Sequence, residues 1–483
     1  MHRDNYKVIY ASFEVAPFFK TGGLGDVAGS LPAALRECGA DVRVMLPKPA
    51  GLDVRFAGKL THVADFTVPL GWRQQYCGVE LLEYQGITYY FIDNEYYFKR
   101  ERPYGWGDDA ERIAFFAKAV LESLQHLPGF FPDILHCNDW HTALCPVFLR
   151  EQYMQAVGYD RLKTVFSVHN LKFQGVFGGD VLGDILGLHG SPTAREQLMT
   201  GDCINYMRGA ACCSDRLLTV SPSYADEICT PEYGEGLQEI FCRRRAVLQG
   251  ILNGIDTAEY DPAHDAHLPA RFGAADMAGK AVCKRELQRQ LGLAERADVP
   301  LAVLVSRLTE QKGIDLLLHI LEELLQHDIQ VAVLGVGEAR YEQAFSHFAA
   351  VQPARFACRL AFNDALAHQF YAGADMLLMP SRFEPCGLSQ MIAMRYGALP
   401  VVRATGGLKD SVRPYDSADG TGNGFSFADY NAHELLYTLQ RALALWQKPE
   451  LWQRLVAQAM AADHSWHHSA AQYAEVYRGL LEQ

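Results

Sequence analysis

The chain of 483 residues is longer than one hydrophobic core usually organises, so two or three domains are expected. Its composition, with 49% hydrophobic and 21% charged residues, is that of a folded globular protein and excludes the disordered and fibrous classes. A formal net charge of −13 argues against the basic surface that nucleic-acid binding requires, so no nucleic-acid partner is expected.

The sequence shows no targeting or membrane-spanning segment. No apolar stretch of the signal-peptide type follows the first residues, and no later apolar run reaches the ~18 residues that a membrane span needs. The twelve cysteines contain no C-x-x-C spacing, which disfavours a zinc ribbon or a redox motif of that type. We therefore expect a cytoplasmic protein with free, mostly buried thiols and no membrane partner.

A glycine-rich turn follows the first predicted strand. The strand covers Lys7–Phe13, and the turn, KTGGLGD at Lys20–Asp26, leads into a helix that precedes a second strand at Val42–Leu46. Glycines at a helix start let backbone N–H groups approach an anion, and Lys20 adds a positive charge. This βαβ unit therefore predicts an anion site at the turn.

The same turn fits the dinucleotide template G-x-G-x-x-A from Gly23 to Ala28, so a nicotinamide-dependent dehydrogenase is an alternative. Two features oppose it. The connector between strand and glycines is long, and no acidic residue ends the strand Val42–Leu46 to bind a ribose hydroxyl.

Residues 61–98 differ from their surroundings because they form short β-rich runs that contain many tyrosines. We expect a small β insertion here, followed by a helix over Asp109–Leu124. The aromatic side chains of the insertion either pack in its core or line a sugar-binding surface.

Polar residues follow two predicted strands of the first domain. Asp139 and His141 come after one strand, and His169 and Asn170 come after the strand Lys163–Val168. Because the carboxyl ends of parallel strands share one edge of a sheet, these side chains should lie close together. Asp139 and His141 are candidates for an acid–base couple, whereas His169 is either a structural histidine or a site residue.

A turn-rich segment near residues 250–256 marks the expected domain boundary. We assign residues 1–250 to an N-terminal domain, 251–458 to a second domain, and 459–483 to a C-terminal helix that packs back across both. Both domains alternate strands and helices, which predicts an α/β fold with two Rossmann-like, doubly wound domains. The predicted strands of the second domain are Leu301–Val305, Gln330–Leu334, Phe356–Ala361, Ala374–Met379 and Leu399–Val402.

Two cations lie in the loop after the first strand of the second domain. Arg307 and Lys312 flank this loop, and Gly313 begins the next helix. Arginine offers a fork that matches phosphate oxygens and lysine a point charge, so the pair suits a diphosphate. The alternative is that both are solvated surface cations.

A single carboxylate, Glu384, stands beyond the strand Ala374–Met379, and a helix starts directly after it at Gly387–Ser389. Thr405 opens a second glycine turn. Helix-start N–H groups bind phosphate, and a carboxylate binds vicinal sugar hydroxyls, so the combination fits a sugar nucleotide.

A metal-held diphosphate usually requires a D-x-D pair, and the sequence contains none. We therefore expect no metal and no other cofactor. Arg307 and Lys312 would then neutralise the charge on the departing diphosphate.

Seven motifs spread over almost the whole chain resemble those of the bacterial glycogen synthase family and occur in the family's order. They are KTGGLGD at Lys20, HCNDWHTAL at His136, SVHNLKFQG at Ser167, GILNGID at Gly250, SRLTEQKGID at Ser306, SRFEPCGLSQ at Ser381 and RATGGLKDSV at Arg403.

The resemblance implies a glucosyltransferase of GT-B architecture, in which two Rossmann-like domains face a cleft. It would transfer glucose from ADP-glucose to the non-reducing end of glycogen or another α-1,4-glucan, with retention at the anomeric carbon. The proposed mechanism for such enzymes is front-face attack, in which the leaving phosphate helps to deprotonate the acceptor hydroxyl.

The resemblance also implies roles for five residues. Lys20 would meet the phosphates, Arg307 and Lys312 would bind the diphosphate, Glu384 would bind glucose hydroxyls, and His169 would lie near the anomeric carbon. The other implied substrate contacts are Gly22, Gly23, Asp139, Asn170, Phe362, Cys386, Gly387, Leu388, Ser389 and Thr405.

The sequence departs from related glycosyltransferases at two places. Ile392 stands where many of them have a second glutamate, and Ala361-Phe362 replaces a Gly-aromatic pair, although Phe362 would still stack on adenine. The alternatives are another metal-independent transferase, such as one that makes a disaccharide or uses UDP-glucose, and a non-catalytic carbohydrate-binding protein.

Overall fold

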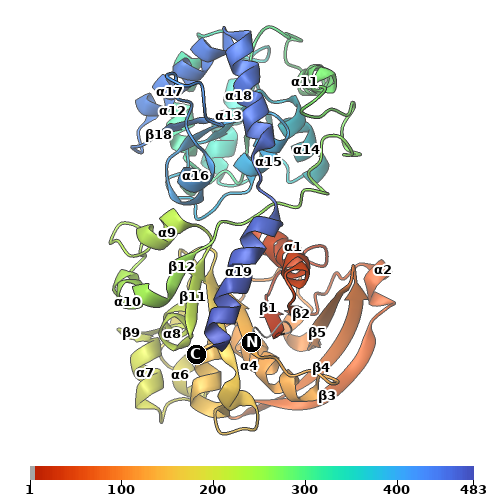
Figure 1. The fold of residues 1–483 in the computed structure, drawn as a ribbon. Helices are drawn as coiled ribbons and strands as arrows, with labels where there is room; N and C mark the ends of the chain where they lie inside the picture. Colours follow the sequence, from red (N-terminus) through yellow and green to blue (C-terminus); the bar gives the residue numbers. More distant parts are fainter. Residues whose placement is uncertain (1–5, 483) are drawn as a thin grey trace. The chain divides into compact units, whose positions relative to one another are not determined.

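The computed structural model describes residues 6–482. The chain forms two compact units (Figure 1). Unit 1 comprises Met1–Gly254 and Trp466–Gln483, and unit 2 comprises Ile255–Ser465. The chain thus passes between the units after Gly254 and again after Ser465, whereas the sequence placed the first boundary after residue 250. Residues 1–5 and 483 of the expected domains lie outside the described residues.

Unit 1 is built on a nine-stranded sheet in the order β12-β11-β7-β6-β1-β2-β5-β4-β3. From β12 to β5 neighbouring strands are parallel, and β4 and β3 add an antiparallel edge. The strands are β1 (Lys7–Ala11), β2 (Asp41–Pro47), β3 (Thr61–Leu70), β4 (Arg73–Tyr84), β5 (Ile87–Asp93), β6 (Ile134–Asn138), β7 (Lys163–Val168), β11 (Arg216–Thr219) and β12 (Leu248–Gly250).

The expected small β insertion is part of this main sheet. β5 pairs in parallel with β2, with Val44 opposite Tyr89, and β4 and β3 continue the sheet from β5. Most residues of β5 are buried, as an internal strand requires, whereas β3 at the edge alternates toward solvent. Residues 95–98 form a helical turn, α3 (Glu95–Phe98).

Helices cover the sheet of unit 1, and the last helix of the chain is one of them. α19 runs beside α1 (Figure 1), and its Tyr473 and Tyr477 belong to the same core as the buried face of α1. The expected terminal helix, residues 459–483, therefore begins later, at Trp466, and packs within unit 1. The helices are α1 (Gly23–Glu37), α2 (Val54–Ala57), α4 (Asp109–Ser123), α5 (Leu144–Phe148), α6 (Val181–Asp184), α7 (Pro192–Leu198), α8 (Tyr206–Cys213), α9 (Pro222–Glu227), α10 (Gln238–Arg243) and α19 (Trp466–Leu481).

Shorter elements complete unit 1. A three-stranded sheet has the order β8-β10-β9. These elements are β8 (Val176–Gly178), β9 (Met199–Thr200), β10 (Cys203–Asn205), and the single turns η1 (Leu124–His126), η2 (Leu149–Tyr153), η3 (Tyr159–Arg161) and η4 (Arg245–Val247).

Unit 2 contains a six-stranded, wholly parallel sheet in the order β15-β14-β13-β16-β17-β18. Its strands are almost continuous apolar runs because helices bury both faces. The strands are β13 (Leu301–Val305), β14 (Gln330–Leu334), β15 (Phe356–Arg359), β16 (Met376–Met379), β17 (Leu399–Arg403) and β18 (Phe425–Phe427). The helices are α11 (Ala278–Leu291), η5 (Glu310–Lys312), α12 (Ile314–Leu324), α13 (Ala339–Val351), α14 (Asp364–Gly373), α15 (Ser389–Arg395), α16 (Gly406–Ser411), α17 (Ala432–Trp446) and α18 (Pro449–Ala461). Both units thus have the predicted doubly wound α/β architecture.

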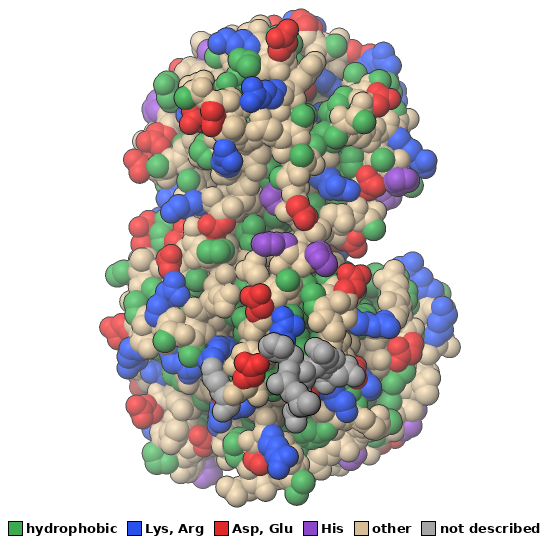
Figure 2. Space-filling model, in the orientation of Figure 1, with side chains coloured by type: hydrophobic (Ala, Val, Ile, Leu, Met, Phe, Trp, Pro, Cys, Tyr) green, Lys and Arg blue, Asp and Glu red, His purple; other side chains and the backbone are tan. Residues whose placement is uncertain are grey.

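Acidic and basic side chains are interspersed over the face shown in Figure 2, as on an ordinary globular surface. Among residues 6–482, no helix combines the length and the apolar character needed to cross a membrane.

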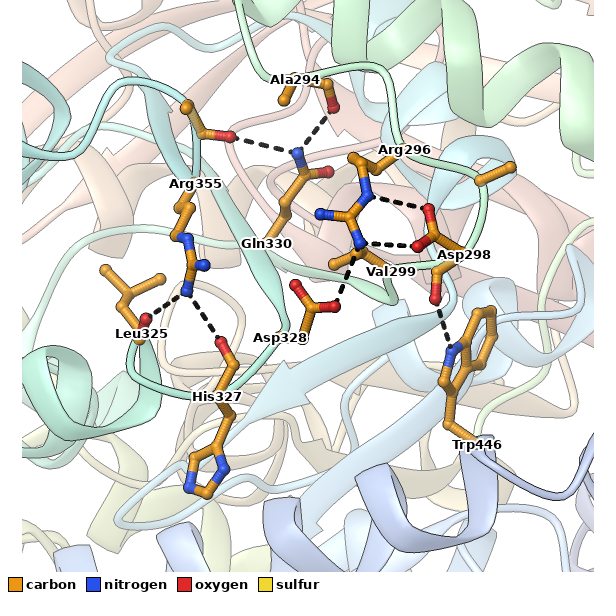
Figure 3. Close-up of polar contacts among 12 residues, drawn as sticks. Ala294, Arg296, Asp298, Val299, Leu325, His327, Asp328, Gln330, Arg355 and Trp446 are labelled. Atoms are coloured by element: carbon orange, nitrogen blue, oxygen red, sulfur yellow. Dashed lines mark hydrogen bonds and ion pairs between the residues drawn. The ribbon is translucent and has the colours of Figure 1, made fainter.

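The amino edge of the sheet in unit 2 is closed by polar side chains that bind one another or the backbone (Figure 3). Gln330, the first residue of β14, donates to the carbonyl oxygens of Ala294 (2.7 Å) and Ala354 (3.2 Å). Arg355, just before β15, donates to the carbonyl oxygen of Leu325 at 2.7 Å. Arg296 forms ion pairs with neighbouring aspartates. These contacts stabilise the fold, so we assign the amino edge a structural role.

Candidate active site

At the opposite, carboxyl edge of the sheet in unit 2, the loop after β13 packs against the end of β16. Gly313 adopts φ +68°, and a Cβ there would lie 1.9 Å from the carbonyl oxygen of Pro380. Only glycine permits both the left-handed backbone and this close approach. The contact places Lys312, the residue before Gly313, beside the segment that follows β16.

Lys312 and Glu384 form the central ion pair of this edge. The Nζ of Lys312 lies 2.5 Å from Oε2 of Glu384, and the side chains are 17% and 7% exposed. The hydroxyl of Ser381 donates to the same carboxylate oxygen at 3.1 Å. Within residues 6–482, Oε1 of Glu384 accepts no hydrogen bond, so this oxygen remains available to a ligand hydroxyl.

A second glycine turn, at the start of α16, contacts the backbone of the Glu384 segment. The N–H of Gly407 donates to the carbonyl oxygens of Glu384 and Pro385, both at 3.1 Å. A Cβ at Gly406, which has φ +45°, would lie 2.1 Å from the carbonyl oxygen of Glu384. The start of α16 therefore fixes the backbone that carries the carboxylate, and Thr405, which precedes it, is buried.

The residues after Glu384 are held by Gln390, which sequence reasoning did not identify. Its Nε2 donates to the carbonyl oxygens of Cys386 (3.1 Å) and Gly387 (2.9 Å). Ser389, the first residue of α15, accepts a hydrogen bond from the hydroxyl of Tyr371. Cys386, Gly387, Leu388 and Ser389 thus form one short segment whose backbone is held by the buried Gln390.

Arg307 is exposed, and its guanidinium forms no ion pair with any residue from 6 to 482. Phe362 is 72% exposed. Both side chains follow strands of the same sheet, β13 and β15, so both stand at the carboxyl edge. An unpaired cation and an exposed aromatic ring at this edge are suited to a phosphate and a flat base, respectively.

In unit 1, the glycine-rich turn begins α1. Gly22 is the N-cap of α1 and Gly23 its first residue, and both are exposed. The Nζ of Lys20 lies 3.1 Å from Oδ1 of Asp26, with the lysine side chain 28% exposed. The turn thus combines helix-start N–H groups with a cation, the two features of an anion site, although Glu14 accepts a hydrogen bond from the backbone of Gly22 and Asp26 pairs with Lys20.

Glu14 orders this turn and was missed by sequence reasoning. Its carboxylate, buried in the protein, accepts hydrogen bonds from the backbone N–H and the hydroxyl of Thr21. Burial raises the pKa of Glu14, while the bonds from Thr21 oppose that rise. The spacing of Glu14 and Thr21 in the sequence does not predict this contact, because the contact depends on the path of the backbone between the two residues.

Asp139 organises the loop ends after β6 and β7. Its Oδ1 accepts from the backbone N–H of His169 at 2.7 Å and from that of Asn170 at 3.4 Å. Burial raises the pKa of Asp139 to about 7, and the two N–H groups act in the opposite direction. The residue also adopts φ +55°, which is rare outside glycine. The three predicted residues of this edge therefore lie together.

His169 is a neutral histidine in a fixed tautomer. Its Nε2 lies 2.9 Å from Oδ1 of Asn138, and the Nδ2 of that asparagine donates to the carbonyl oxygen of Ala11, which fixes the amide orientation. Because an amide oxygen only accepts, Nε2 of His169 carries the proton. Burial lowers the pKa of His169 to about 4.

The expected acid–base couple of Asp139 and His141 is not formed. The Asp139 carboxylate is directed to the backbone of residues 169 and 170, and Nδ1 of His141 has no hydrogen-bond partner among the described residues. His141 instead stacks on Phe13 and Tyr104, with ring centroids 5.3 and 4.7 Å away. Aromatic packing therefore determines the position of this histidine.

The predicted residues thus gather in two groups. In unit 2 they surround the Lys312–Glu384 pair, and in unit 1 they form the α1 turn and the Asp139–His169 loops. Among residues 6–482, no group of three or more His, Cys, Asp or Glu side chains has the arrangement of a metal site.

Comparison with known proteins adds independent evidence. The starch synthase catalytic domain family matches residues 7–243, and the family of glycosyl transferases group 1 matches residues 285–459. The chain is 50% identical over 477 residues to the glycogen synthase of Geobacillus thermodenitrificans, covering 99% of this chain and 98% of that one. It is 48% identical over 475 residues to the glycogen synthase of Desulfitobacterium hafniense, covering 98% and 99%.

The structure is also similar to a solved one. The catalytic domain of starch synthase IV from Arabidopsis thaliana, bound to ADP and acarbose, matches with a TM-score of 0.92 and 34% identity. The match covers 99% of this chain and 100% of that chain.

Proposed function

The chain belongs to the glycogen synthase family of glycosyltransferases, and on that premise we propose that its donor is ADP-glucose. Glucose is transferred to the non-reducing end of an α-1,4-glucan with retention at the anomeric carbon and without a metal ion. The observation that carries this proposal is the Lys312–Glu384 pair at the carboxyl edge of the sheet in unit 2, the edge at which Arg307 follows β13. The bound ADP and acarbose of the starch synthase IV structure support the choice of ligands.

The donor diphosphate is bound in unit 2 by Arg307 and Lys312. Within residues 6–482, Arg307 has no ion pair that phosphate binding would have to break, so its charge is available to phosphate oxygens. Lys312 contributes an ammonium group that already lies at the glucose-binding carboxylate. Stabilising the negative charge on the leaving diphosphate is the largest catalytic effect of these two cations.

Glu384 positions the glucose. Its Oε2 is occupied by Lys312 and Ser381, and Oε1 accepts a sugar hydroxyl. A retaining glycosidase needs a second carboxylate about 5–5.5 Å from the first. The two groups that bind Glu384 are a cation, Lys312, and a hydroxyl, that of Ser381. We propose front-face attack, in which the leaving phosphate accepts the proton of the acceptor hydroxyl.

The residues of unit 1 complete the binding roles. Lys20 and the N–H groups of Gly22 and Gly23 bind phosphate. His169 is neutral, and so it lies against the uncharged sugar rather than a phosphate. Asp139 and Asn170 keep the His169 loop in place. Phe362 stacks on adenine.

Radiolabelled donors test the proposal directly. The protein is incubated with glycogen and either ADP-[¹⁴C]glucose or UDP-[¹⁴C]glucose, with and without EDTA, and label is counted in ethanol-insoluble glucan. We expect incorporation from ADP-glucose that EDTA does not change. Incorporation only from UDP-glucose would replace the donor, loss with EDTA would overturn the metal-independent route, and no incorporation from either donor would overturn the proposed reaction.

A further inference from the structure

Two cysteines outside the candidate site lie together at the base of one loop of unit 1. Cys229 follows α9, and Cys242 lies within α10. The thiol of Cys242 donates to the carbonyl oxygen of Cys229 at 3.0 Å. The Sγ of Cys229 lies 3.4 Å from the carbonyl oxygen of Ala225, one helical turn earlier. Residues 230–241, which include the first residues of α10, are therefore flanked by two cysteines that lie close together.

The surroundings of the two thiols differ in a way that suits stepwise oxidation. Cys242 is exposed, and Cys229 is half-buried. Burial, and then the neighbouring Cys242 thiol, raise the pKa of Cys229 to about 11, whereas Arg245 acts to lower it. An exposed thiol meets a dissolved oxidant first, and a neighbour within hydrogen-bonding reach can then resolve the adduct.

We propose that Cys229 and Cys242 form a reversible intrachain disulfide, with a low-molecular-weight disulfide such as oxidised glutathione as the oxidant. The Cys242 thiolate attacks the external S–S bond, which gives a mixed disulfide and releases one small thiolate. The Cys229 thiolate then attacks Sγ of Cys242, forming the protein disulfide and releasing the second small thiolate. The protein loses two electrons and two protons, and the two released thiolates take them up as thiols.

This disulfide closes a ring that contacts the His169 loop. Glu235, inside the ring, accepts a hydrogen bond from Nε2 of Gln174 through its carbonyl oxygen at 2.9 Å. Gln174 also donates to the carbonyl oxygen of Leu171 at 3.0 Å, in the segment that directly follows His169 and Asn170. Oxidation therefore stiffens the loop that supports this segment. The inference does not depend on the identity of the sugar donor.

Peptide mapping tests the disulfide in the full-length protein. The reduced protein is treated with excess oxidised glutathione, remaining thiols are blocked with N-ethylmaleimide, and the digest is analysed by mass spectrometry. We expect a linked pair of peptides that contain Cys229 and Cys242, lighter than the reduced pair by two hydrogen atoms and separated by dithiothreitol. Cys203→Ser, which changes the other exposed cysteine, should retain this linkage, and Cys242→Ser should lose it.

A lasting glutathione adduct on Cys242 with Cys229 still free would overturn the proposal, as would linkage of Cys242 to any other cysteine. Because these results come from the wild-type protein, they hold even where a variant folds poorly. Hydrogen exchange tests the effect on the loop. The amides of residues 230–241 should exchange more slowly after oxidation of the wild type, with no change in Cys242→Ser, and equal exchange rates in the oxidised and reduced wild type would overturn the stiffening.

Discussion

The two edges of the sheet in unit 2 carry similar residue types but differ in how completely those residues are partnered. At the amino edge, Asp375 lies 2.7 Å from Nζ of Lys284 and also accepts from the backbone N–H of Leu301 at 2.8 Å. At the carboxyl edge, Arg307 has no ion pair among residues 6–482, whereas Arg296 at the amino edge pairs with Asp298 and Asp328.

The partners of a charged group, more than its type or its burial, distinguish the residues that stabilise the fold from those that can bind a ligand. Asp375 and Glu384 are both buried carboxylates that face a lysine. The second partner of Asp375 is the backbone N–H of Leu301 at a strand end, whereas the second partner of Glu384 is a side-chain hydroxyl, that of Ser381. The N–H of Gly407, in α16, binds the backbone carbonyl of Glu384. The Oε1 atom of Glu384 accepts no hydrogen bond from residues 6–482 and can accept one from a ligand.

The largest expected effect is at the amino edge. Asp375→Asn leaves the buried Lys284 without its counterion, so the free energy of unfolding should fall by about 3–5 kcal/mol. The kcat of the folded fraction should stay unchanged, because this edge faces away from the proposed donor. Urea denaturation together with a glucosyl-transfer assay checks both. A fall in kcat with unchanged stability would contradict the division between the edges.

Arg307→Ala should show the opposite behaviour at the carboxyl edge. We expect kcat to fall on the order of 10²-fold, about 2.7 kcal/mol, because a cation is removed from the leaving diphosphate. Stability should not change, because the exposed guanidinium forms no ion pair within the described residues. Steady-state kinetics and thermal unfolding provide the measurements.

Arg296→Ala is the matched control for Arg307→Ala. Arg296 is an arginine of the amino edge, its side chain is 42% exposed, and it pairs with Asp298 and Asp328. Its loss should lower stability only slightly, because exposed ion pairs contribute little, and should leave kcat unchanged. Equal kinetic losses in the two arginine variants would show that position at the carboxyl edge confers no special role.

The sequence was sufficient where a local pattern determines the structure. Lys163–Val168, Leu301–Val305 and Gln330–Leu334 were predicted with the bounds that the structure has, because strands buried on both faces are continuous apolar runs. A final helix was also predicted, but it begins at Trp466 rather than at residue 459, and the sequence did not indicate the unit on which it packs.

Contacts between distant segments were not predictable. The joining of residues 61–93 to the main sheet depends on the pairing of β5 with β2, which no local pattern encodes. Glu14 supports the candidate residues of unit 1 and Gln390 those of unit 2, both through backbone groups that any residue possesses. A single sequence therefore identifies side chains with distinctive chemistry but misses the residues that position them.

A similar difference exists in unit 1 between His141 and His169. Both follow strands at the same edge of the sheet, but His141 is held by aromatic packing. Burial lowers its pKa to about 3. Since the unfolded chain binds a proton near pH 6.5, the stability from neutral His141 is complete above that pH and is lost as the pH falls toward 3.

At pH 5.5 the loss from one such histidine is about 1.4 kcal/mol. His141→Phe cannot bind the proton, so its free energy of unfolding should change less between pH 8 and pH 5.5 than that of the wild type, by about this amount. His467→Phe, which removes an exposed histidine of α19, is the matched control. Urea denaturation at the two pH values measures the difference. If the free energy of unfolding of His141→Phe depended on pH as that of the wild type does, packing at this edge would not keep the histidine neutral. His141 would then be grouped with the residues that can bind a ligand.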